Sequence, residues 1–144
     1  RNSTQRLSPA RLARAAPGLA ALILEIVMTA IVPVRTSIAA GQALSGPVAS
    51  VGYGVCLLLL PVAWTDAPLT LQGSLDDSEP AAWADLYDHL GNEVVLTVAA
   101  GRALTLPPTL LLGWRWLRLR SGLAAAPMNQ AAERLLTLGI RPLA

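Results

Sequence analysis

The chain of 144 residues contains no lysine, no phenylalanine and one cysteine, Cys56, and only 14% of its residues are charged. A soluble domain usually has about 25% charged residues, because each of its elements presents a solvated face. A single cysteine excludes an internal disulfide and a cysteine-cluster metal site. Lysine and phenylalanine have AT-rich codons, so their absence indicates a GC-rich coding sequence. The shortage of charge favours a membrane protein; a very apolar helix buried in a soluble assembly is the alternative.

Motifs that carry catalysis are also missing. The sequence has no glycine-rich phosphate loop, no HExxH and no G-x-S-x-G. His89 and Asp85 are four residues apart, but one histidine and one carboxylate are too few ligands for a metal. The net charge of +2 is too small to indicate a nucleic-acid partner. We therefore predict a protein that is not an enzyme, with no catalytic residue, no cofactor, no metal and no nucleic-acid partner.

Three apolar stretches stand out, at residues 18–34, 47–65 and 94–113. The second has no charged residue, and the other two have one ionisable residue each, Glu25 and Arg102. About 20 helical residues match the ~30 Å hydrocarbon core of a bilayer. This length predicts an all-α integral membrane protein with about three transmembrane or membrane-embedded helices and short amphipathic surface helices. The expected location is the inner membrane of a GC-rich bacterium or of an organelle.

The predicted segments follow from these stretches and from the proline and glycine positions. They are a basic N-terminal tail (1–17), a membrane helix kinked or broken near Pro33 (18–44), a second membrane helix (47–65), an acidic loop (66–92) with an amphipathic helix (79–90), a third membrane helix kinked at Pro107-Pro108 (93–119), and a C-terminal tail (120–144) with an amphipathic helix (127–138). The arginine distribution weakly places the C-terminus inside, and a re-entrant first segment with both ends inside is the alternative.

The N-terminal tail has four arginines and no acidic residue. Three interpretations remain open for it: a cytoplasmic tail that contacts anionic lipids, the remnant of an organelle presequence, and the charged region of a signal peptide. The first is favoured.

Glu25 and Arg102 are each isolated within an apolar stretch. A charge at this depth costs several kcal/mol unless it is paired or wetted. We predict that the two residues form an intramembrane polar clamp between helices. A proton or cation relay is the alternative role.

Residues 78–91 carry the strongest local pattern. Ser78 is a suitable N-cap, and Gly91 is suited to a left-handed stop. Between them the apolar side chains recur at helical spacing, which predicts a helix on the membrane surface or on a partner. Its contact residues are Trp83, Leu86, Tyr87 and Leu90.

Aromatic and aliphatic residues alternate with arginine after Gly113. As a strand this segment would have period two, but at the end of an apolar helix it predicts an interfacial anchor for anionic lipids. The predicted anchors are Trp114, Arg115, Trp116, Arg118 and Arg120.

Together these features predict a small, non-catalytic accessory or structural subunit of a larger multi-subunit membrane complex. Its expected partners are other membrane protein subunits and anionic lipids. The alternative is an oligomeric channel or transporter component that uses Glu25 and Arg102 as intramembrane polar groups.

Overall fold

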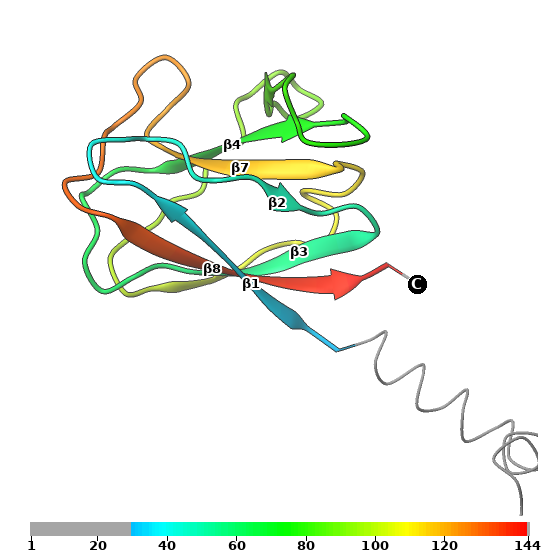
Figure 1. The fold of residues 1–144 in the computed structure, drawn as a ribbon, viewed down its shortest axis with the longest axis horizontal. Helices are drawn as coiled ribbons and strands as arrows, with labels where there is room; N and C mark the ends of the chain where they lie inside the picture. Colours follow the sequence, from blue (N-terminus) through cyan, green and yellow to red (C-terminus); the bar gives the residue numbers. More distant parts are fainter. Residues whose placement is uncertain (1–29, 144) are drawn as a thin grey trace, which may run out of the picture.

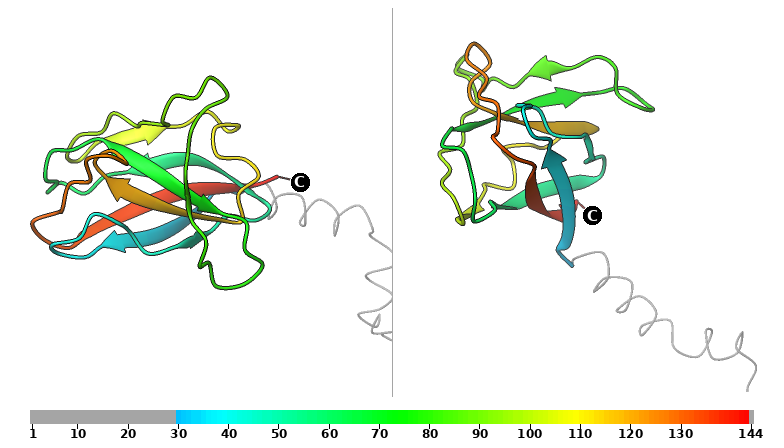
Figure 2. Two further views of the ribbon diagram at one scale, coloured as in Figure 1. Left: turned by 90° about the horizontal axis from the view of Figure 1, so that it is seen from above. Right: turned by 60° about the vertical axis from the view of Figure 1, so that its left-hand side comes forward.

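The computed structural model describes residues 30–143, which form eight β-strands in two antiparallel sheets (Figure 1). The first sheet has the order β1-β8-β3-β6 and the second has the order β2-β7-β4-β5. The first consists of β1 (Val32–Ile38), β8 (Arg134–Pro142), β3 (Tyr53–Leu59) and β6 (Ala103–Thr105). The second consists of β2 (Val48–Ala49), β7 (Trp116–Ser121), β4 (Leu69–Ser74) and β5 (Ala84–Asp85). The sheets lie face to face as the two layers of a β-sandwich-like fold (Figure 2).

The core between the sheets is built from leucine, valine and isoleucine. Successive side chains of a strand point to opposite faces, so every second residue enters the core. In β7 these residues are Leu117 and Leu119, and in β8 they are Leu136, Leu138 and Ile140; all five are at most 4% exposed. These five residues, four of which were predicted to lie in a membrane or amphipathic helix, therefore face the opposite sheet.

The predicted all-α fold is wrong. The residues from 30 to 143 contain no α-helix, so neither the transmembrane helices nor the amphipathic helices predicted there exist. Within this range no helix has the length and hydropathy needed to cross a bilayer. The predicted inner-membrane location and the predicted sidedness depended on helical spans, and this finding overturns both.

Residues 47–65, the predicted second membrane helix, form β2, a turn and β3. Gly52 has a φ of +78°, which glycine adopts far more readily than other residues, and the Tyr53 N–H closes the turn by donating to the Ser50 carbonyl at 3.0 Å. Beyond the turn, Leu58 and Leu60 are buried whereas Leu59 is 47% exposed. This alternation is typical of a strand that has one face in the core and one face toward solvent.

Residues 93–119, the predicted third membrane helix, form β6, irregular loops and the first part of β7. Gly101 and Gly113 have φ values of +68° and +91°, and both lie in turns. Pro107-Pro108 lies in the connection after β6 and kinks no helix. The segment from Trp116 forms a strand with period two, so the predicted end of an apolar helix is wrong here.

The two predicted amphipathic helices are also replaced by strands and turns. Residues 79–90 contain β5, and Tyr87 pairs with Glu93 in an isolated antiparallel bridge. Gly91 does have the predicted positive φ, +85°, but in a turn between bridge partners. Residues 127–138 contain the beginning of β8.

Three predictions lie mainly or wholly outside the described residues. They concern the basic tail at 1–17, the site of Glu25, and most of the apolar stretch at 18–34. The end of that stretch, from Val32, is part of β1.

Candidate functional site

The outer face of the second sheet is polar and is overlaid by one segment of the chain. Cross-strand pairs place Thr70 opposite Arg120 and Gln72 opposite Arg118, with their side chains pointing away from the core. Residues 75–93, which we call the acidic segment, carry six of the nine acidic residues of the chain and include the edge strand β5. The polar side chains of the sheet are partnered mainly from this segment.

Arg120 is the centre of this network and is 6% exposed. Its Nη1 lies 2.6 Å from Asp85 Oδ1 and its Nη2 lies 3.2 Å from Glu93 Oε1. Its Nε donates to Thr70 Oγ1 at 3.0 Å. The hydrogen bond from Arg120, followed by one from Gln72, lowers the pKa of Asp85 below its ordinary value. A guanidinium can be buried here because two carboxylates and a hydroxyl satisfy it.

Arg118 extends the network to an aromatic ring. Its Nε donates to Gln72 Oε1 at 2.6 Å, and its guanidinium carbon lies 4.3 Å from the centroid of the Trp83 ring. The Gln72 amide in turn donates to Asp85 at 2.9 Å. Burial, followed by the neighbouring charge of Arg120, lowers the pKa of Arg118. The cation–π contact and the hydrogen bonds hold the acidic segment against β4 and β7.

A further set of bonds fixes the first residues of the acidic segment. The Trp116 indole N–H donates to the Asp76 carbonyl at 3.0 Å. The Asp76 carboxylate accepts from the backbone N–H groups of Ala81 at 2.8 Å and Ala82 at 2.9 Å. The bonds from Ala82 and Ala81 lower the pKa of Asp76. The segment is therefore pinned at its beginning as well as at β5.

The outer face of the first sheet has the opposite character. The register points five apolar residues outward, next to polar ones such as Ser37 and Thr137. We call these five residues the apolar face: Pro33, Leu57, Leu59, Ala103 and Leu135. Leu59 is 47% exposed and Leu135 is 53% exposed. None of the four strands contains an acidic residue. Among residues 30–143, no carboxylate lies within ion-pair distance of Arg35 or Arg141, the two arginines on the same side of the sheet.

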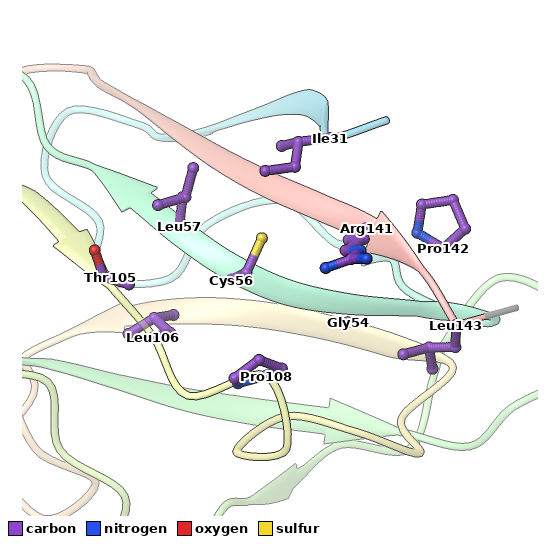
Figure 3. Close-up of a pocket in the computed structure, with 10 residues that line it drawn as sticks. All are labelled: Ile31, Gly54, Cys56, Leu57, Thr105, Leu106, Pro108, Arg141, Pro142 and Leu143. Carbon is purple, nitrogen blue, oxygen red and sulfur yellow. The ribbon is translucent and has the colours of Figure 1, made fainter. Parts of the chain in front are cut away.

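A pocket of about 520 Å³ opens at the end of the apolar face where β8 finishes (Figure 3). Cys56 and Gly54 form part of its floor, and Leu106 and Pro108 form one wall. Among residues 30–143, Arg141 is the one charged residue that lines it. The Cys56 thiol donates to the Gly139 carbonyl at 3.3 Å, and this cysteine is partly exposed.

The structure joins two groups of predicted site residues that the sequence analysis kept apart. Trp83, from the predicted surface helix, lies against Arg118, from the predicted lipid anchors. Leu86 from the same predicted helix is buried, whereas Tyr87 is 56% exposed and Leu90 is 74% exposed. These residues do not share one contact face, because the segment that carries them is not helical.

The remaining predicted anchors and the predicted clamp lie in different environments. The Trp114 ring packs over Gly73, where an added Cβ would clash with it. Arg115 forms an exposed ion pair with Asp77 at 3.1 Å. Arg102 is exposed in a loop, and its carbonyl accepts the N–H of Leu60 at 2.9 Å. Glu25 lies outside the described residues, so its pairing with Arg102 stays a prediction.

Sequence reasoning missed Gln130, which is fully buried. Its Nε2 donates to the Thr65 carbonyl at 3.0 Å and to Ser121 Oγ at 2.7 Å, and its Oε1 accepts the Thr65 N–H at 2.9 Å. The amide joins the connection between β7 and β8 to the loop that precedes β4. No sequence signal marks it, since glutamine is usually exposed.

These observations define a two-layer antiparallel β-fold whose outer faces differ. One outer face is polar and is covered by the acidic segment, and the other carries exposed apolar residues. The part of the chain that the structure describes holds no group of three or more His, Cys, Asp or Glu residues arranged to bind a metal. Comparison of the chain with protein-family models, curated proteins and solved structures gives no match.

Proposed function

We propose that this chain is a non-catalytic structural subunit of a larger protein assembly, which contacts its neighbour through the apolar face. The observation that carries the proposal is the exposure of Leu59 and Leu135 on one side of a regular sheet. Large apolar side chains that are exposed together on one face mark interaction sites. Covering each half-exposed leucine would contribute about 1 kcal/mol to association.

The charges around the apolar face specify the partner. Arg35 and Arg141 lie on this side of the sheet, so an incoming surface must bring acidic groups. Two identical apolar faces brought together would place arginines near arginines. Symmetric face-to-face pairing is therefore disfavoured.

The acidic segment has the required complementary chemistry. It exposes Leu75 by 63% and Leu90 by 74%, and Glu79 and Asp88 are exposed in the same segment. A backbone hydrogen bond from Asn92 is the largest cause that lowers the pKa of Asp88, which favours its charged form. The neighbour is accordingly a second copy of this chain, which docks its acidic segment on the apolar face.

Such a head-to-tail contact leaves one unused face on each end copy. It therefore repeats until the copies close a ring or extend a filament. The network around Arg120 suits this role, since it holds the acidic segment in one position before docking and so lowers the entropic cost of association.

Sedimentation velocity of the full chain over a concentration series tests the proposal. The expected result is association that strengthens with concentration and weakens with added salt. Leu135→Glu is expected to weaken it by about tenfold or more, because the variant removes apolar contact and adds a carboxylate that faces the acidic segment.

The matched control is Val51→Glu. Val51 is 58% exposed, close to the 53% of Leu135, but it lies in the turn between β2 and β3 rather than on the apolar face. Thermal unfolding of both variants shows whether the fold is intact. A chain that stays monomeric at every concentration, or two variants that weaken association equally, would contradict the proposal.

A further inference from the structure

The pocket beside Cys56 exists because of an irregularity in β3. The register between β3 and β8 shifts between Val55 and Leu57, so Cys56 is the extra residue of a β-bulge. Bulges redirect a side chain out of the regular alternation. Here the Cys56 thiol turns toward the Gly139 carbonyl, and the surface beside it is left hollow (Figure 3).

One glycine lines this hollow, and a second lies beneath two of its lining side chains. A Cβ at Gly54 would lie 3.3 Å from Leu143 Cδ2, within the space that the pocket occupies. A Cβ at Gly139 would lie 2.8 Å from Leu57 Cβ, so glycine lets the Leu57 side chain lie flat over β8. The sequence therefore places no side chain where a ligand would rest.

The walls are apolar, and the pocket is large enough for a small ligand. Ile31 and Leu57 line one side, and Leu106 and Pro108 line the other. Ligand pockets commonly enclose about 300–1,000 Å³ and combine apolar walls with a few polar groups. The volume of about 520 Å³ lies within that range.

Arg141 determines the chemistry of the polar end. It is exposed at the pocket, and among the described residues no carboxylate lies within ion-pair distance of it. Guanidinium groups bind carboxylates through two parallel hydrogen bonds. We propose that the pocket binds an aliphatic monocarboxylate, whose chain lies between the apolar walls and whose carboxylate pairs with Arg141.

Cys56 provides the readout, because it is the only thiol in the chain and it lies in the pocket. Its alkylation by N-ethylmaleimide, followed by mass spectrometry of the full chain, reports how accessible the pocket is. Decanoate is expected to slow alkylation in a saturable way. Decanol has the same chain without the charge, and it is expected to protect less at equal concentration.

Two variants assign the effect to the pocket. Arg141→Gln is expected to weaken protection by decanoate about two- to fivefold and to leave protection by decanol unchanged, as befits an exposed ion pair. Thr105→Trp, at an exposed wall position, is expected to fill the pocket and abolish protection by both ligands. Arg102→Gln, at an exposed loop position outside the pocket lining, is the control and is expected to behave as the unmodified chain.

The pocket shares Leu57 and Arg141 with the surface of the proposed assembly, but Leu135 lies near the beginning of β8 and does not line the pocket. Leu135→Glu therefore tests the assembly alone, whereas Thr105→Trp tests the pocket. The absence of protection by decanoate would overturn the inference. Equal protection by decanoate and decanol in the unmodified chain would also overturn it. Thiol protection that follows protein concentration and ignores decanoate would show that a second copy, rather than a carboxylate, occupies the pocket.

Discussion

The two outer faces of this molecule are both built on four-stranded antiparallel sheets but have different surroundings. On the second sheet, Arg118 and Arg120 meet two carboxylates and an indole ring from the acidic segment, and Arg118 also donates to the Gln72 amide of β4. On the first sheet, Arg35 and Arg141 have no such partner among residues 30–143. The comparison shows that one face is covered by a segment of its own chain, whereas among residues 30–143 no segment covers the other in this way.

The largest expected difference between the faces comes from removing one arginine on each side. Arg120→Met is expected to lower the free energy of unfolding by about 3 kcal/mol, because it leaves Asp85 and Glu93 without their counter-charge in a largely buried site. Arg35→Met, on the open face, is expected to change it by less than about 0.5 kcal/mol. Urea unfolding of both variants measures the difference, and equal losses would contradict the contrast between the faces.

A smaller effect is expected from the aromatic contact. Trp83→Ala removes the ring from Arg118 and is expected to cost about 1 kcal/mol, since the ring is half-buried and the cation–π contact is partly solvated. Hydrogen exchange is expected to rise in the acidic segment and to stay unchanged in β8. Faster exchange throughout the chain would show that Trp83 supports the whole fold rather than this segment alone.

The smallest effect is the response to acid. The pKa of Asp85 is lowered first by Arg120 and then by Gln72, so Asp85 stabilises the fold fully above the pKa of the unfolded chain, near 3.8. This stability is lost as pH falls further, through the lower pKa of the folded state. Unfolding followed from pH 7 to pH 2 is expected to show a loss below about pH 4 that Arg120→Met greatly reduces. An unchanged acid response in Arg120→Met would assign it to other carboxylates.

Part of this fold could have been read from the sequence. Leucine and arginine alternate with period two from Leu117 to Arg120, and the structure places Leu117 and Leu119 in the core and Arg118 and Arg120 outside it. The prediction of membrane helices rested instead on the length of the apolar stretches. Yet glycines and prolines divide residues 47–65 and 94–113 into pieces of strand length, and Gly52 and Gly101 lie in turns with positive φ.

The candidate sites could not be read in the same way, because they are made by distant pairings. Arg120 meets Glu93 and Asp85 across 27 and 35 residues. The pocket joins Ile31, Cys56 and Arg141, which come together only when β1 and β3 pair with β8. Sequence patterns report which residues share a face of one strand, but they do not report which strands become neighbours.

Footprinting with a photoactivated carbene at increasing protein concentration tests most directly whether the open face is the contact surface. If the acidic segment docks on the apolar face, labelling is expected to fall at Leu59 and Leu135 and at Leu75 and Leu90. Labelling of Val51 is expected to stay constant. Labelling that remains unchanged at Leu59 and Leu135 as the chain associates would contradict this docking.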